Sequence, residues 1–315
     1  MSMNIIAILL YCMTSLMLVK QPIHVDLYKN SEILLQTGNR GQWQNPVFIS
    51  GSVKVLGSEN PISGKGRLLI YLPLNYKPGK EYPLVVALHG WNHLPEQWKE
   101  MSTIASFADL YSYVIVCPDM GTSVYETRFF PETKKAWNNV PGTPWLLQVV
   151  LPFLKEHYPT NKISILGYST GGRGAVMAVM HGGPFQNCAS LSGTFDLATL
   201  KPKTGEYRIH AQVYGDRSKF SARWVQESCN RAELITMVRN CTFYLGHGEK
   251  DSVVDSGQTH AMGLSLTQSQ VTNILFISPN AGHDWPFWNS QLGEVFKMME
   301  HIPKKPLVEV LTPGK

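Results

Sequence analysis

Short apolar runs, rich in β-branched residues, recur along the chain, and each ends at a glycine-rich or polar turn. Runs of this kind are typical of buried strands. They are Tyr82–Leu88, Tyr113–Cys117, Lys162–Leu166, Cys241–Gly246 and Val271–Ile277. Stretches of helical composition lie between them, at Trp145–His157, Gly174–His181 and Ser256–Leu264. The alternation predicts an α/β fold whose mostly parallel central sheet has helices on both faces.

Two further strands are expected nearer the N-terminus, at Gly51–Leu56 and Arg67–Leu72, with a hairpin loop at Pro61–Gly66 between them. They would form an antiparallel edge of the sheet. The chain has 315 residues, 43% of them apolar, and no repeat or linker interrupts it. We therefore expect one domain over residues 21–315, in which residues 195–240 form a small cap.

Gly167-Tyr168-Ser169-Thr170-Gly171 follows the predicted strand Lys162–Leu166 and precedes a predicted helix. In this context a Gly-x-Ser-x-Gly motif predicts a nucleophile elbow, a sharp strand-to-helix turn that exposes a serine. The glycines let strand and helix approach closely, and the helix N-terminus directs N–H groups at the space above the serine. The alternative is a tight turn whose serine only caps the helix.

A serine nucleophile needs a base and an acid that orients it, and in α/β hydrolases both follow it in the chain. The loop after the strand Cys241–Gly246 offers Asp251, which we favour, with Asp255 and Glu249 as alternatives. Such loops lie at the strand ends where open parallel sheets bind their ligands. A solvated turn carboxylate is the other interpretation of any of the three.

His283 is the favoured base, because it ends the loop that leaves the strand Val271–Ile277 and so shares a sheet edge with Ser169. His247 and His260 are the other downstream candidates, although His260 falls within a predicted helix. His89 and His93 precede the serine and break the expected order.

The residue after the nucleophile and a loop after an earlier strand are expected to form an oxyanion hole. The predicted donors are the backbone N–H groups of Thr170 and Trp91, the latter just beyond the strand Tyr82–Leu88. Two such donors would stabilise the oxyanion of a tetrahedral intermediate, each by about 3 kcal/mol.

Taken in order, these residues resemble the putative-esterase family of α/β hydrolases, which includes esterase D-like, feruloyl-esterase-like and siderophore-ester hydrolases and mycolyl transferases. The segments that carry the resemblance are Leu88-His89-Gly90, Pro152-Phe153-Leu154 with Tyr158-Pro159, Gly167–Gly172, Leu191-Ser192-Gly193, Gly248–Asp251 and Gly282–Trp285. The resemblance covers about residues 65–300. It implies an α/β-hydrolase fold and a triad of Ser169, Asp251 and His283. Thr170 departs from the methionine of many members, which leaves a backbone donor intact.

Specificity is expected to come from loops at the carboxyl edge of the sheet. The loop Met120–Thr143 is long enough to predict a wall of the substrate site, and aromatic residues near the triad would add stacking surface. The candidate substrate-binding residues are Tyr168, Arg128, Trp137, Trp285 and Trp288, with Tyr125, Phe129, Phe130, Trp91 and Phe287 as further aromatic or loop residues. For each aromatic, simple packing is the alternative.

The net charge of +5 is not clustered, since the pairs Lys134-Lys135 and Lys304-Lys305 are isolated. Nucleic acid is therefore not an expected partner. The sequence has no phosphate-binding glycine loop and no metal-ligand spacing, so no cofactor or metal is expected.

Ile5–Leu18 is an apolar run of signal-peptide length, too short to span a bilayer, within a hydrophobic segment 1–20. It predicts a secreted or periplasmic protein, although the n-region lacks Lys and Arg. A cytoplasmic protein whose N-terminal segment packs on the domain is the alternative. Cys229 and Cys241 flank a helical segment, and the sequence leaves open whether they form a disulfide.

The sequence thus predicts a serine carboxylic-ester hydrolase acting on a small-molecule or glycan-linked ester, with a carbohydrate-linked or aromatic acyl group as candidate substrates. A thioesterase or acyl transferase with the same triad is the enzymatic alternative. A non-catalytic binding module on a hydrolase fold is the alternative of another class.

Overall fold

The structure is a computed structural model that describes residues 41–130, 140–301 and 308–311. The predicted signal segment 1–20 and Trp137 lie outside these residues. Within them, no helix is both long enough and apolar enough to cross a membrane.

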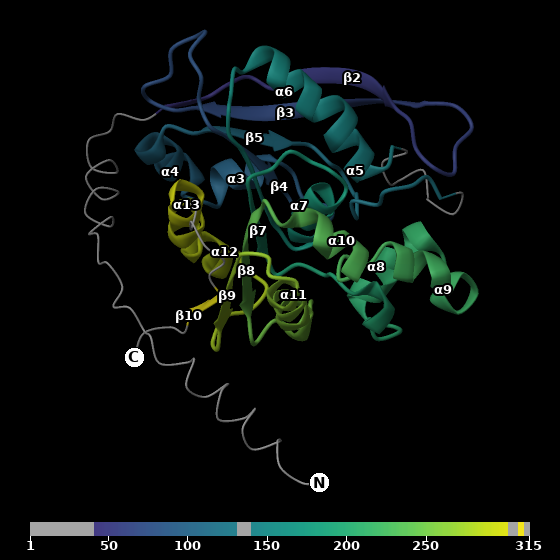
Figure 1. The fold of residues 1–315 in the computed structure, drawn as a ribbon. Helices are drawn as coiled ribbons and strands as arrows, with labels where there is room; N and C mark the ends of the chain where they lie inside the picture. The colour runs from purple at the N-terminus through teal and green to yellow at the C-terminus, as the bar shows by residue number, and fades with distance from the viewer. Residues whose placement is uncertain (1–40, 131–139, 302–307, 312–315) are drawn as a thin grey trace.

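The described strands form one 10-stranded sheet in the order β1-β3-β5-β4-β6-β7-β8-β9-β10, with β2 paired to β3. Their bounds are β1 Gln42–Trp43, β2 Val47–Val53, β3 Ile62–Leu72, β4 Leu84–Leu88, β5 Val114–Pro118, β6 Ile163–Tyr168, β7 Asn187–Leu191, β8 Thr242–Gly248, β9 Asn273–Ser278 and β10 Val308–Leu311. Neighbouring strands are parallel in the part of the sheet that runs β5-β4-β6-β7-β8-β9-β10. β3 pairs antiparallel with β1, β2 and β5. The predicted parallel sheet with an antiparallel N-terminal edge is therefore confirmed (Figure 1).

Helices cover both faces of this sheet, each over a separate apolar cluster. On one face lie α3 Glu96–Glu100, α4 Ile104–Tyr111, α12 Trp285–Ser290 and α13 Leu292–Glu300. On the other lie α5 Gly142–Trp145, a π-helical turn Leu146–Val150, α6 Leu151–His157, α7 Thr170–Met180, α10 Ala232–Ile235 and α11 Gly257–Gln268. The central strands β4 to β8 are buried along their whole length, which explains why they are continuous apolar runs in the sequence.

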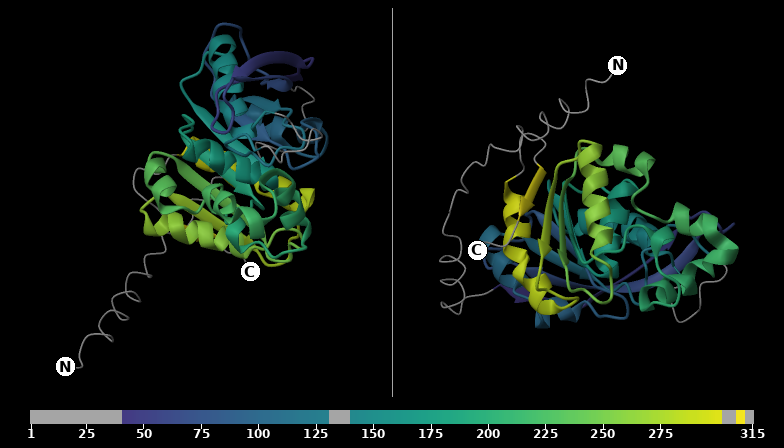
Figure 2. Two further views of the ribbon diagram at one scale, coloured as in Figure 1. Left: turned by 90° about the vertical axis from the view of Figure 1, so that its right-hand side faces the viewer. Right: turned by 90° about the horizontal axis from the view of Figure 1, so that it is seen from below.

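Residues 195–240, expected as a cap, form a helical lobe. It contains the 3₁₀ turns Leu197–Thr199 and Thr236–Val238, together with α8 Gly205–Tyr214, α9 Arg217–Gln226 and α10. α8 and α9 stand beside the sheet, on the side away from α4 and α13 (Figures 1 and 2). A third apolar cluster, centred on Trp224 and Tyr214, holds the lobe together. That the lobe caps a substrate remains a prediction.

The prediction of a hairpin loop at Pro61–Gly66 is wrong. β3 already begins at Ile62, and the turn between β2 and β3 falls earlier, around Gly57. Gly64 and Gly66 allow close packing rather than a turn. A Cβ on either residue would lie 3.1 Å from the Trp145 ring, so the glycines let this ring lie closely against β3.

The four described cysteines, Cys117, Cys188, Cys229 and Cys241, are all free and buried. Cys229 and Cys241 therefore form no disulfide with each other. Burial raises the pKa of the Cys229 thiol to about 11, so it is a neutral, unreactive thiol at physiological pH.

Candidate active site

Ser169 occupies the turn between β6 and α7 with φ 55° and ψ −129°, a conformation that non-glycine residues rarely adopt. Its backbone N–H donates to the Leu191 carbonyl on the adjacent β7 at 2.8 Å, which holds the turn in place. A Cβ on Gly167 would lie 2.1 Å from the Gly171 carbonyl, and one on Gly171 would lie 2.5 Å from the Leu88 carbonyl. Both glycines are therefore required for this turn, which is the strand–turn–helix of the predicted elbow.

His283 lies beyond the end of β9 and bridges Ser169 to Asp251. Its Nε2 is 2.9 Å from Ser169 Oγ, and its Nδ1 is 2.6 Å from Asp251 Oδ2. The His283 side chain is 11% exposed and that of Asp251 is fully buried. The three residues come from loops after β6, β8 and β9, at the carboxyl edge of the sheet.

The ionisation state of Asp251 determines which ring nitrogen of His283 carries a hydrogen. Burial alone would raise the pKa of Asp251, but hydrogen bonds from His247 and His283 hold it well below its ordinary value. An ionised carboxylate only accepts hydrogen bonds, so His283 Nδ1 carries a hydrogen. In the neutral ring, Nε2 is then the acceptor that faces the Ser169 hydroxyl.

The alternative carboxylates stay outside this arrangement. The Asp255 side chain is 69% exposed beside Lys201, and Glu249 is exposed. Asp251 differs because its Oδ1 accepts the backbone N–H groups of Val253 and Val254, both at 2.8 Å. Those two bonds turn the carboxyl group inward.

The alternative histidines take other positions. His260 is exposed on α11. His89 is buried, with Nδ1 2.8 Å from the Gly90 carbonyl and Nε2 accepting the Met120 N–H at 2.9 Å. His93 lies closer to the site, with Nδ1 3.0 Å from the Tyr168 hydroxyl, and burial and the nearby His283 lower its pKa.

The predicted oxyanion donors, Thr170 and Trp91, belong to two segments that both lie next to Ser169. Thr170 is the first residue of α7, where backbone N–H groups have no acceptor within the helix. Trp91 follows Gly90 at the end of β4. A Cβ on Gly90 would lie 3.2 Å from Ser169 Cβ, so this loop passes directly over the serine.

Aromatic rings surround the histidine. Trp288 packs edge-on against His283 with ring centroids 5.1 Å apart, and its indole N–H donates to Ser192 Oγ at 3.1 Å. Tyr168 stacks on Trp288 at 4.4 Å and donates its hydroxyl hydrogen to Gln97. Because Tyr168 and Trp288 are 0% and 3% exposed, they support the site from beneath and offer a substrate little surface. Trp285 is half-buried and contacts both rings.

The described part of the loop Met120–Thr143 packs largely inward. Tyr125 is 1% exposed, and its hydroxyl donates to the His89 carbonyl at 2.8 Å. Phe130 is also buried and packs edge-on against Tyr214 of the lobe. Arg128 and Phe129 are partly exposed, so they keep surface for the predicted wall of the substrate site.

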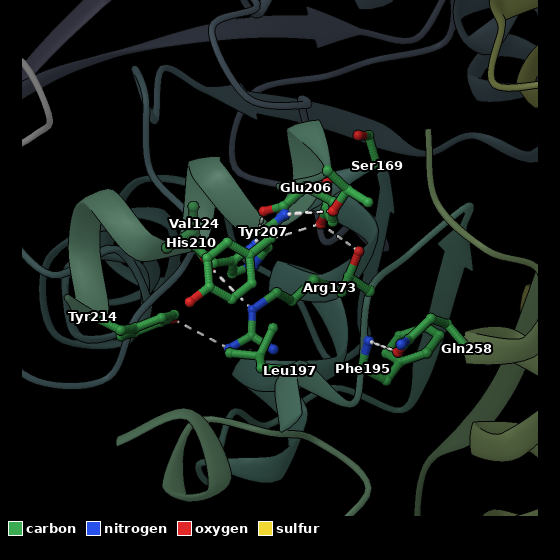
Figure 3. Close-up of polar contacts among 12 residues, drawn as sticks. Val124, Ser169, Arg173, Phe195, Leu197, Glu206, Tyr207, His210, Tyr214 and Gln258 are labelled. Atoms are coloured by element: carbon green, nitrogen blue, oxygen red, sulfur yellow. Dashed lines mark hydrogen bonds and ion pairs between the residues drawn. The ribbon is translucent and has the colours of Figure 1, made fainter. Parts of the chain in front are cut away.

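A buried arginine with no assigned role in the sequence predictions links α7, the helix that follows Ser169, to the lobe. Arg173 lies on α7, four residues after Ser169, and is 0% exposed. It donates to the carbonyls of Val124 and Glu227 and to Cys229 Sγ. It also donates to the Tyr214 hydroxyl (Figure 3). Burial alone would lower its pKa, but Tyr214, Cys229 and Glu227 raise it above the ordinary value. Little in the sequence indicated that Arg173 is buried, because an arginine in a helix usually occupies an exposed position.

A cavity of about 610 Å³ lies between the lobe and the acid loop, on residues that include Asp196, Leu200, Glu206, Asp255 and Gln258. Gln258 joins the two sides, since its Oε1 accepts the backbone N–H groups of Phe195 and Asp196. Glu206 is buried and accepts from Thr194 Oγ1 at 2.5 Å (Figure 3). Within the described residues, no cluster of His, Cys, Asp or Glu could hold a metal ion.

The chain was also compared with known protein families and structures. Residues 60–299 match the family model described as "Putative esterase". A bifunctional acetylxylan esterase/xylanase of Neocallimastix patriciarum is 26% identical over 145 residues, which are 42% of this chain and 20% of that protein. The chain thus spans about a fifth of the length of this curated relative.

Two solved structures share the fold at 16% identity, each over 82% of this chain. An S-formylglutathione hydrolase from Agrobacterium tumefaciens superposes with a TM-score of 0.62 over 97% of its length. A ferulic acid esterase superposes with a TM-score of 0.57 over 98% of its length. The fold is that of the α/β hydrolases, and with three quarters of its length matched by the family model, the chain belongs to the putative-esterase family.

Proposed function

We propose that the protein hydrolyses carboxylic esters through an acyl-enzyme on Ser169. The observation that carries the proposal is the unbroken hydrogen-bonded chain from Ser169 Oγ through His283 to Asp251. A serine hydroxyl is a weak nucleophile at neutral pH, and an adjacent base oriented by a carboxylate is the arrangement that activates it. Membership of an esterase family supports the same reaction.

In the first half-reaction, Ser169 Oγ attacks the acyl carbonyl while its proton passes to His283 Nε2. Asp251 keeps Nδ1–H bonded and stabilises the imidazolium that forms. The backbone N–H groups of Thr170 and Trp91 are the proposed donors to the oxyanion. Collapse of the tetrahedral intermediate breaks the ester C–O bond, and His283 returns the proton to the departing alcohol. Water then repeats the sequence on the acyl-enzyme and releases the acid.

The proposed substrates are esters with a carbohydrate-linked or aromatic acyl group. The partly exposed Trp91 and Trp285 offer rings on which a sugar or aryl group would stack. The similar proteins include an acetylxylan esterase and a ferulic acid esterase, whose names match these two classes. Arg128 is the proposed polar contact at the rim.

The test compares Ser169→Ala with Ser218→Ala, which removes an exposed serine on α9 as a matched control. We expect Ser169→Ala to lower turnover of p-nitrophenyl acetate by roughly 10⁴- to 10⁶-fold and to abolish fluorophosphonate labelling, while circular dichroism is unchanged. Full activity in Ser169→Ala would refute the proposal.

A panel of methyl ferulate, acetylated xylan, p-nitrophenyl acetate and a matched thioester then identifies the acyl class. Preference for the thioester would assign the same triad to thioester hydrolysis. Transfer to an added alcohol in place of hydrolysis would identify an acyl transferase. A folded chain that neither turns over an ester nor labels would be a binding module.

A further inference from the structure

A second histidine, His247, contacts the proposed acid, Asp251. His247 is the sixth residue of β8, four residues before Asp251, and its side chain is fully buried. Its Nε2 lies 3.1 Å from Asp251 Oδ2, the same oxygen that accepts from His283. The same Nε2 is 3.0 Å from the Val254 carbonyl, and Nδ1 is 2.6 Å from Thr259 Oγ1 on α11.

The neighbours of His247 determine where its hydrogen lies. A backbone carbonyl only accepts hydrogen bonds, so the 3.0 Å contact with the Val254 carbonyl requires a hydrogen on Nε2. Nε2 also lies 3.1 Å from Asp251 Oδ2, so the positive end of this N–H group is close to the carboxylate. Thr259 can donate its hydroxyl hydrogen to Nδ1, and this bond fixes the ring orientation.

Asp251 consequently accepts three hydrogen bonds and has a fourth N–H group nearby. The backbone N–H groups of Val253 and Val254 bind Oδ1, His283 binds Oδ2, and His247 Nε2 lies 3.1 Å from Oδ2. The side chain is fully buried, so water does not supply a replacement if one donor is lost. His247 is the donor that acts on the oxygen bonded to His283.

We propose that His247 is a positioning residue for the triad: its Nε2–H holds Asp251 Oδ2 in line with His283 Nδ1 and takes up part of the carboxylate charge. The inference rests on the proposed function of Ser169, His283 and Asp251. The polar contacts of His247 among the described residues are with Asp251, Val254 and Thr259, so it acts on the triad through Asp251.

Two consequences follow from a lost donor on Oδ2. The carboxylate is less firmly oriented, which lowers kcat because His283 is aligned less often. The carboxylate also keeps more of its charge for His283 and stabilises the imidazolium. The acid limb of the pH profile of kcat/KM therefore moves to higher pH. His93, which also acts electrostatically on His283, is unchanged in every variant.

The experiment uses the full chain and three variants. His247→Phe keeps a planar ring but removes the donor, His247→Gln keeps an N–H near the position of Nε2, and Thr259→Val removes the hydroxyl that orients the ring. His260→Phe, which changes the adjacent exposed histidine on α11, is the matched control. Each is assayed with p-nitrophenyl acetate for kcat, KM and the pH profile, with Ser169→Ala as the activity blank.

For His247→Phe we expect kcat to fall about 10-fold or more with KM within about twofold, and the acid limb to move up in pH. His247→Gln should recover most of kcat and the wild-type pH profile. Thr259→Val should have a kcat between those of wild type and His247→Phe. His260→Phe should match wild type. A His247→Phe enzyme with lower thermal stability but unchanged kcat and profile would overturn the inference and leave the triad intact. If His247→Phe does not fold, the other two variants decide. An equal loss of kcat in His247→Gln and Thr259→Val, with an unchanged pH profile of kcat/KM, overturns the inference.

Activity that survives in Ser169→Ala would instead refute the proposed function itself. The two failures are therefore distinguishable in one set of measurements.

Discussion

Glu126 should make the folded state less stable as the pH rises toward neutrality. Glu126 lies in the segment between β5 and α5 and is 3% exposed. Ser123 Oγ donates a hydrogen bond to its carboxyl group at 3.3 Å. Burial, assisted by the neighbouring Glu227, raises the pKa of Glu126 to about 7 from an ordinary value of 4.5. A carboxyl that keeps its proton only in the folded state links stability to pH.

The sign follows from proton binding. Below about pH 4.5 the folded and unfolded chains both hold the proton, so this residue adds no pH dependence. Between about pH 4.5 and 7 only the folded chain keeps it, and each rise in pH favours unfolding. Above about pH 7 both are ionised and the loss is complete. At 1.36 kcal/mol for each pH unit between the two pKa values, the loss is about 3 kcal/mol.

Glu126→Gln has nearly the same shape and stays neutral at every pH, so it should lack this loss. Urea unfolding of wild type and variant, at intervals from about pH 4 to pH 8, gives the free energy of unfolding of each. We expect the variant to gain about 3 kcal/mol relative to wild type across this range. Titrating groups that do not interact with Glu126 cancel in the comparison.

Glu156→Gln, which neutralises an exposed carboxyl on α6, is the control and should run parallel to wild type. If Glu126→Gln also runs parallel to wild type over the whole range, Glu126 is ionised in the folded state at lower pH. The reasoning from its burial would then be refuted.

Asp251→Asn should lower kcat by roughly 10⁴-fold with KM little changed, because an amide cannot accept from His283 and both backbone N–H donors at once. Asp255→Asn, at a side chain 69% exposed, should be near wild type, and the reverse ranking in steady-state assays would mean that Asp255 is the acid. Thr170→Val keeps the backbone N–H and removes a buried hydroxyl that has no hydrogen-bond partner in the described structure, so kcat should be unchanged and thermal stability equal or higher. A loss of kcat of more than about 10-fold would show that the hydroxyl itself takes part.

The sequence predicted most of the sheet because its central strands are buried on both faces. Burial of both faces requires apolar residues at every position, and the ends of such runs are visible without a structure. The elbow at Ser169 was predictable for a similar local reason, since strand, glycines and helix are contiguous in the chain. The position of His283 followed from the sheet edge at which parallel strands end.

Burial and side-chain direction were harder to predict. The sequence placed Tyr125 in a substrate wall and proposed substrate contacts for Tyr168, but both lie 0–1% exposed and bond to backbone or core groups. An aromatic residue in a long loop gives the same pattern whether it points outward or inward. Likewise Gly64 and Gly66 indicated a turn, while their actual role is to admit the Trp145 ring.

The amino-acid sequence by itself determined the positions of most strands along the chain, the elbow and the edge of the sheet where the polar residues gather, because each depends on residues that are neighbours in the chain. Only the tertiary structure decided which carboxylate His283 meets, that His247 shares it, and that Arg173 ties α7 to the lobe. These depend on which donors and acceptors converge from segments as much as 54 residues apart, and spacing along a chain carries no record of that convergence.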